Sequence, residues 1–134
     1  MYKTNFLPYI GTEQIKFDSV REEIRNSLGA YKEFKKTKFS KNTTDDFTFC
    51  HVFYDANNKV EAIEYFDTIE LLYKEKNLFL LLFTELKSFL KSNSIDYQED
   101  DFGFKSDSIG LSVYSPEKTK IESLLIYKKG YFNY

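Results

Sequence analysis

Residues 45–66 read "DDFTFCHVFYDANNKVEAIEYF", and this stretch determines the fold class because it has the pattern of two strands joined by a turn. From Phe47 to Tyr54 almost every residue is β-branched or aromatic, which favours an extended strand. The next four residues, "DANN", are of the types that form tight turns, and residues 59–66 resume the strand pattern. The stretch therefore predicts a β-hairpin.

A second stretch has a similar pattern. Residues 100–127 read "DDFGFKSDSIGLSVYSPEKTKIESLLIY". Both stretches open with Asp-Asp-Phe-x-Phe, reach a tyrosine after a strand-like run, and resume after a turn with Lys-Val-Glu or Lys-Ile-Glu. The match, which places Tyr54 over Tyr114, predicts two copies of a helix-plus-hairpin unit at residues 17–66 and 78–127. Chance matching of two hairpins rich in Lys, Glu and Tyr is the alternative.

Each hairpin follows a helical pattern. Residues 17–29, "FDSVREEIRNSLG", repeat apolar side chains at helical spacing, with a Ser-x-x-Glu capping pattern at Ser19 and a glycine stop at Gly29. Residues 78–93, "LFLLLFTELKSFLKSN", carry a second apolar face and predict a well-buried helix. Two helices are therefore expected.

Other segments predict further strands. Residues 30–41 mix aromatic residues with lysines and are interpreted as an exposed edge strand, and residues 68–73 predict another strand. Residues 109–114 alternate apolar and polar side chains, and residues 120–127 pair back to them. We expect the α+β class, with an antiparallel sheet of about five or six strands and two helices on one face.

Composition limits the possible functions. A chain of 134 residues is long enough for one ordinary domain, so residues 1–134 are expected to form a single domain. The net charge of -2 gives no field that would draw the chain onto nucleic acid or an anionic membrane. One cysteine and an N-terminus without a signal-peptide core favour a cytoplasmic location.

Residues that could carry out chemistry are few. Cys50 and His51 are neighbours on a predicted strand, so their side chains should point to opposite faces and have no joint role. Paired carboxylates occur at Asp45-Asp46 and at residues 99–101, where solvated turns are the simpler interpretation. We expect no catalytic residues, no metal site and no cofactor.

The helix at residues 17–29, a polar gap and the hairpin at residues 47–66 resemble small bacterial α+β domains. These include the SmpA/OmlA-type assembly lipoproteins and the tandem-repeat β-lactamase inhibitory proteins. The chain is also similar to immunity proteins of polymorphic or contact-dependent toxins, which carry such a hairpin and a terminal Gly-Tyr-Phe, here at residues 130–132. The chain departs from the lipoprotein pattern, because no signal peptide or lipid-bearing cysteine is found near the N-terminus.

The resemblance implies a cytosolic bacterial immunity protein that binds and neutralises a cognate toxin without catalysis. The alternative is a small enzyme or ligand-binding domain with a carboxylate-lined pocket. The partner is expected to present a basic surface, because both hairpins keep acidic residues ahead of a phenylalanine. The candidate contact residues are Asp45, Asp46, Glu99, Asp100, Asp101, Tyr54 and Tyr114.

Overall fold

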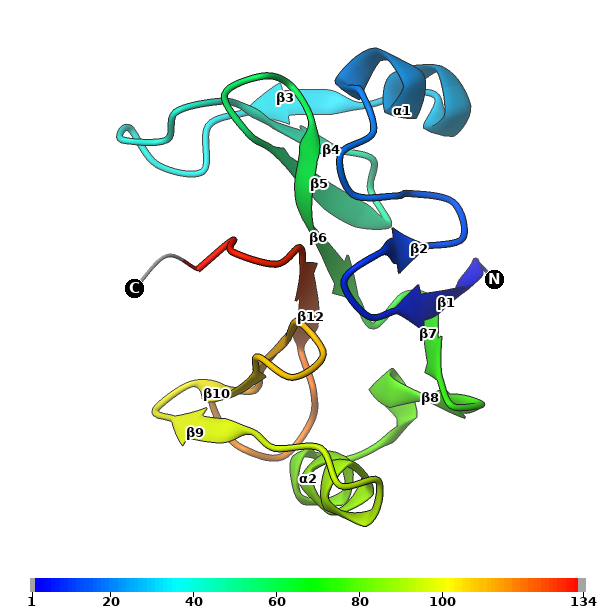
Figure 1. Cartoon of the computed structure of the whole chain (residues 1–134), viewed down its shortest axis with the longest axis vertical. Coiled ribbons are helices and arrows are strands. Elements are labelled where there is room, and N and C mark those ends of the chain that lie inside the picture. Colours follow the sequence, from blue (N-terminus) through cyan, green and yellow to red (C-terminus); the bar gives the residue numbers. More distant parts are fainter. Residues whose placement is uncertain (1, 133–134) are drawn as a thin grey trace.

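A large antiparallel sheet forms the centre of the molecule (Figure 1). The structure is a computed structural model, and it describes residues 2–132. Eight strands lie in the order β3-β4-β5-β6-β12-β11-β10-β9. Their bounds are β3 Lys32–Phe34, β4 Thr44–Asp46, β5 Cys50–Tyr54, β6 Val60–Phe66, β9 Gln98–Asp100, β10 Gly103–Ser106, β11 Leu111–Tyr114 and β12 Ser123–Tyr127.

A smaller sheet lies beside the large one. It has the order β2-β1-β7-β8, and β1 and β7 pair in parallel. The predicted strand at residues 68–73 is present as β7, but it belongs to this second sheet. The bounds are β1 Lys3–Leu7, β2 Gly11–Thr12, β7 Glu70–Tyr73 and β8 Lys76–Asn77.

The two predicted helices are present but shorter than expected. α1 spans Arg21–Leu28, and Gly29 ends it with a φ of 88°. The expected capping box is wrong, because Val20 precedes the helix without a side-chain cap and the Ser19 carbonyl accepts a hydrogen bond from the Val60 N–H. In the second segment a single 3-10 turn, η1 (Leu78–Leu80), precedes α2 (Phe83–Ser92).

The core lies between one face of the large sheet and a layer formed by α1, the small sheet and α2. Figure 1 shows the helices at opposite ends of the molecule with the small sheet between them. Ile24 of α1, Leu71 of β7 and Leu86 of α2 are buried in the same cluster as Val52 and Leu124 of the large sheet. Both helices therefore pack on one face of the sheet, as predicted.

The expected sheet size is wrong, because the large sheet has eight strands rather than five or six. The additional strands are β4, β9 and β10, and each has three or four residues. Glycine and aspartate, which are depleted in strands, occur in all three of these segments or at their ends. Short polar strands do not produce the alternation that identifies a strand from sequence.

The chain follows the same path twice. Each helix is followed by four antiparallel strands, and the last strands, β6 and β12, pair with each other in the middle of the sheet. The residue before each helix forms an isolated antiparallel β-bridge, through the backbone, with a lysine that precedes the last strand of the same half. Val20 pairs with Lys59 in the first half, and Leu82 pairs with Lys120 in the second. The Lys-x-Glu match between the two stretches therefore joins residues in corresponding positions.

Two other sequence matches do not correspond in the structure. Asp45 and Asp46 lie within β4, whereas Asp100 ends β9 and Asp101 lies in the following turn. The strand register also separates the two matched tyrosines. Ala62 and Ser123 hold corresponding positions, three residues after Lys59 and Lys120, and they are opposite Phe53 and Tyr114 respectively. Tyr114 therefore corresponds to Phe53, next to Tyr54.

The Cys50 thiol should be unreactive in the folded protein. Cys50 is fully buried in the core, and burial raises the pKa of its thiol. His51 lies on the other face, between the rings of Phe34 and Phe66. Modification by a soluble aromatic disulfide should be slow in native buffer and fast in denaturant, and rapid native modification would show that Cys50 is accessible.

Candidate functional site

A buried ion network joins α1 to β4. The Asp45 side chain has 0% exposure and accepts bidentate hydrogen bonds from two arginines. Arg21 Nη2 and Arg25 Nη2 donate to Asp45 Oδ1 at 3.0 and 2.8 Å. Arg25 Nε donates to Oδ2 at 2.8 Å, and the Tyr54 hydroxyl donates to the same oxygen at 3.0 Å. All the polar capacity of Asp45 is used inside the protein.

The network is ionised. Burial alone would raise the pKa of Asp45, but hydrogen bonds from Arg25, Arg21 and Tyr54 outweigh it and hold the pKa below its ordinary value. Burial raises the pKa of Tyr54, and the adjacent Asp45 carboxylate raises it further, so the hydroxyl stays a donor. Glu33 of β3 adds a second carboxylate, 3.1 Å from Arg25 Nη2. Two guanidinium groups thus face two carboxylates.

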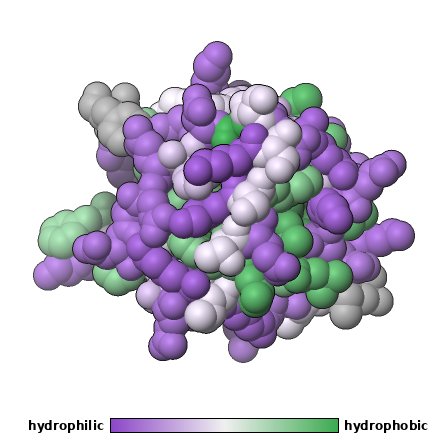
Figure 2. Space-filling view, turned by 90° about the horizontal axis from the view of Figure 1, so that it is seen from below, coloured by the Kyte–Doolittle hydropathy of each residue, from purple (hydrophilic) through white to green (hydrophobic). Residues whose placement is uncertain are grey.

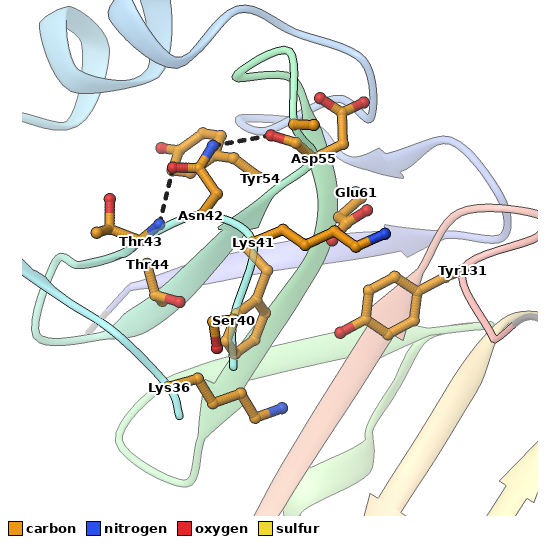
Figure 3. Close-up of a pocket in the computed structure, with 12 residues that line it drawn as sticks. Lys36, Ser40, Lys41, Asn42, Thr43, Thr44, Tyr54, Asp55, Glu61 and Tyr131 are labelled. Atoms are coloured by element: carbon orange, nitrogen blue, oxygen red, sulfur yellow. Dashed lines mark hydrogen bonds between the residues drawn. The ribbon is translucent and has the colours of Figure 1, made fainter. Parts of the chain in front are cut away.

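Arg21 also holds the loop between β3 and β4. Its Nη1 donates to the side-chain oxygens of Asn42 and Asn58, each at 3.1 Å, and its Nη2 donates to Thr43 Oγ1 at 2.7 Å. The Asn42 amide in turn donates to the Asp55 carbonyl oxygen at 2.8 Å (Figure 3). One buried arginine therefore ties this loop to the turn between β5 and β6.

The corresponding place in the second half of the chain is apolar. Arg21 and Phe83 are the first residues of their helices, and Asp45 and Phe104 are opposite Val52 and Val113 in the sheet. Phe83 and Phe104 are buried, and their ring centroids lie 5.5 Å apart. Packed apolar side chains usually stabilise such a position as well as an ion pair does. Packing α1 therefore does not require the ion network, whereas positioning the β3–β4 loop does.

A pocket of about 350 Å³ lies beside this loop. Figure 3 shows Lys36, Lys41 and Asn42 along the loop side and Glu61 and Tyr131 on the opposite side. The full lining is Lys36, Ser40, Lys41, Asn42, Thr43, Thr44, Phe53, Tyr54, Asp55, Ala56, Glu61 and Tyr131. The sheet, the loop and the C-terminal segment each supply part of the wall.

The pocket disfavours added negative charge. Desolvation raises the pKa of the Glu61 carboxyl, and the charge of Asp55 adds to this effect. Lys128 and Lys41 act in the opposite direction on Glu61 without reversing the shift. Burial, followed by the charges of Glu61 and Glu64, raises the pKa of Tyr131 to about 12. A bound cation would relieve these repulsions.

The pocket lies on the face of the large sheet that the helices do not cover, which we call the open face. Across the middle of the open face, one row of side chains from neighbouring strands contains Asp46, His51 and Glu64. This middle row continues through Leu125 to Ser112. His51 Nε2 is 3.5 Å from Asp46 Oδ1, and its Nδ1 is 3.8 Å from Glu64 Oε1. The open face thus presents charged groups between exposed aromatic side chains, which include Phe34 and Tyr114.

A second apolar surface lies at the α2 end of the molecule. Figure 2 shows this end from below, with hydrophobic side chains among hydrophilic ones. Leu80 and Leu82, which come just before the start of α2, are 79% and 53% exposed. Exposed apolar patches often mark contact sites, so this surface competes with the open face as an interface.

The structure does not bring the predicted contact residues together. Asp45 and Tyr54 are buried in the ion network, so the expectation that they form an exposed contact is wrong. Glu99 is exposed but held by Lys87 at 2.8 Å and Lys118 at 2.7 Å. Asp46 lies on β4, near the opposite edge of the sheet from β9, which ends at Asp100. The exposed members of the predicted set are Glu99, Asp100, Asp101 and Tyr114.

Sequence reasoning missed the arginines and Glu61. The signal for the arginines was available, since Arg21 and Arg25 share the apolar stripe of α1 with Ile24 and Leu28 at helical spacing. A charged residue on a buried stripe requires a buried partner. Glu61 had no such signal, because its burial comes from Tyr131 and a loop that are distant in sequence.

No family model, curated protein or solved structure matches this chain. Among residues 2–132, no group of three or more His, Cys, Asp or Glu side chains could hold a metal ion. In the same part of the chain, no helix has the length and apolar character needed to cross a membrane.

Replacing Asp45 by Asn should strongly destabilise the protein. The buried Arg21 and the partly buried Arg25 would lose their shared carboxylate, and breaking a buried pair costs about 3–5 kcal/mol. Denaturant unfolding measures the loss. Glu99→Gln is the control, because Glu99 makes exposed ion pairs in the other half of the chain and its loss should have a much smaller effect. Equal losses of unfolding free energy in the two variants would show that the Asp45 network stabilises the protein no more than an exposed ion pair does.

Proposed function

We propose that this chain is a non-catalytic binding protein, an immunity protein that neutralises a cognate toxin by covering it with the open face. The single observation that carries the proposal is the composition of that face. Phe34 is 36% exposed and Tyr114 46% exposed, on β3 and β11, and His51 and Leu125 lie partly exposed between them. Exposed aromatic side chains are enriched at protein interfaces, where they supply a large contact area.

The centre of the open face is acidic and favours a partner with a basic surface, and Lys32 and Lys105 lie toward the two ends of the same row. Asp46 and Glu64 flank His51 in the middle row. Carboxylates on an exposed surface attract a partner of opposite charge and raise its rate of association. Asp100 and Asp101 are exposed at the edge of the same sheet and would extend this contact. A cytoplasmic location remains part of the proposal.

The alternative function is a small enzyme or ligand-binding domain. The observation that favours it is the pocket at Glu61, where a partly buried carboxylate lies between a lysine and a tyrosine (Figure 3). Pockets with groups of shifted pKa are the usual candidates for ligand sites. The pocket is part of the open face, because Phe53 and Thr44 line it and lie in the cross-strand row next to that of His51.

We also propose that residues 17–66 and 78–127 are two copies of one unit. The repeated path of the chain and the bridges at Lys59 and Lys120 support this proposal. An ion pair between helix and edge strand also recurs, as Arg25–Glu33 in one half and Lys87–Glu99 in the other. Glu33 is opposite Asp45, and Glu99 is opposite Phe104, so the two carboxylates hold corresponding positions.

The immunity proposal is tested with the product of the reading frame next to this gene. Co-expression of the chain should relieve growth arrest caused by that product, and the two proteins should co-purify. Tyr114→Ala should weaken binding by about tenfold or more, as truncation of an interface aromatic typically does. Leu80→Ala is the control, because Leu80 is exposed at the α2 end. A loss of binding in Leu80→Ala but not in Tyr114→Ala would place the interface at the α2 end. If the folded chain forms no complex with the product, the immunity proposal is refuted.

The repeat proposal is tested by copying one half into the other. The triple variant Arg21→Phe, Asp45→Phe and Tyr54→Ser gives the first half the side chains Phe83, Phe104 and Ser115 of the second. It should fold and be more stable than Asp45→Asn, because rings replace an ion pair that would otherwise be broken. Denaturant unfolding of the variants measures this. A triple variant less stable than Asp45→Asn would contradict the correspondence.

A further inference from the structure

We infer that the pocket between the β3–β4 loop and the β5–β6 hairpin binds a basic side chain, an arginine or a lysine, of the protein partner. The inference rests on the proposed function, because it identifies the chemical group of that partner that enters this chain. Three features carry it: an unpaired carboxylate, two aromatic walls, and a lysine of the chain already stacked on one of them.

The unpaired carboxylate is that of Glu61. Among residues 2–132 no group lies within hydrogen-bond or ion-pair distance of this carboxylate, which is partly buried in the pocket, and the charges of Lys128 and Lys41 act on it only from farther away. Asp55, the second carboxylate of the lining, is already held by the turn, where its Oδ1 accepts from the N–H groups of Asn57 and Lys59 at 2.8 and 3.0 Å. An entering guanidinium would give Glu61 the paired hydrogen bonds that a carboxylate accepts best.

The aromatic walls are Phe53 and Tyr131. A cation within about 6 Å of a ring centroid is attracted by the ring face. Lys36 Nζ lies 4.7 Å from the centroid of Phe53, so the chain places its own ammonium group on this wall. A basic side chain of a partner would take the same kind of position.

The lysines of the lining raise the opposite assignment, an anionic ligand. Lys36 and Lys41 belong to the exposed β3–β4 loop, and their long stems can turn outward to solvent. Glu61 lies on β6, and Asp55 lies in the turn that leads to it, so the carboxylates belong to the rigid hairpin. The fixed part of the pocket is anionic and the movable part is cationic. A cation is therefore the ligand that fits without rearranging the sheet.

The Arg21 network gives this pocket its shape. Arg21 holds Asn42 and Thr43, and both line the pocket. The second half of the chain has the Phe83–Phe104 pair in the corresponding place, with no buried charge to hold a loop. The one buried ion network between helix and sheet in the described chain therefore lies directly behind the pocket that we assign to a basic side chain.

The test uses the full chain labelled with nitrogen-15 and millimolar N-acetyl-arginine amide as the probe. Amide resonances of Ala56, Glu61 and Tyr131, which line the pocket, should shift on titration. N-acetyl-citrulline amide has the same shape without the charge, and it should bind about tenfold more weakly because a charged hydrogen bond is replaced by a neutral one. Equal binding of the two probes would overturn the inference.

Three variants determine the sign of the ligand charge. Glu61→Gln should weaken binding of the arginine probe by about fivefold or more, since the charge-assisted bond is lost. Glu64→Gln, on the same strand but outside the pocket lining, should leave it unchanged. Lys41→Ala should strengthen it, because a competing cation is removed. N-acetyl-glutamate amide serves as an anionic probe. If it binds and Lys41→Ala weakens that binding, the pocket is an anion site and the inference is overturned.

The titration needs no toxin, so its outcome separates the two proposals. In one outcome the arginine probe binds, Glu61→Gln abolishes its binding, and the chain fails to neutralise the product of the adjacent reading frame. The immunity proposal then fails and the pocket inference stands. If the chain neutralises that product and Glu61→Gln does so equally well, with no probe binding, the pocket inference fails alone.

Discussion

The antiparallel pairing of β6 with β12 is the interaction on which the rest of the structure depends. Five residue pairs, from Ala62–Tyr127 to Phe66–Ser123, join the two halves of the chain at the centre of the sheet. The side chains of Ile63 and Tyr65 then lie beside Ile126 and Leu124, so one continuous core runs under both halves. Without this pairing, each half would be a four-stranded sheet with one helix and an unprotected edge.

The sequence predicted those parts of the fold that carry long periodic patterns. The hairpin at residues 47–66 and the helix ending at Gly29 were readable, because turn residues and apolar spacing act locally. The outer strands were not, because β4 reads Thr-Asp-Asp and owes its extended form to pairing with β5. Membership of β7 in a second sheet depends on a contact with residues 3–5, which no local pattern encodes.

The candidate site was predictable only in part, for a related reason. Asp45 was chosen as a candidate from its type, but its role depends on Arg21 and Arg25, which are more than nineteen positions earlier. An acidic pair in a sequence looks the same whether it faces solvent or a buried guanidinium. The arginines on the apolar stripe of α1 carried the missing information, since a buried charge requires a partner of opposite charge.

The matching paths of the two halves have a consequence for how such a chain could originate. A half-length chain ending before residue 78 would carry α1 and its four strands, and the edge of β6 that pairs with β12 in the full chain would be open along five residues. The antiparallel partner of β6 in the full chain, β12, ends a helix-plus-four-strand unit of the same order. A second copy of the half chain would offer that same edge through a two-fold axis, as symmetric homodimers do. Under the repeat proposed above, the covalent chain has the form of a fused dimer, in which one half carries an aromatic pair where the other carries charges.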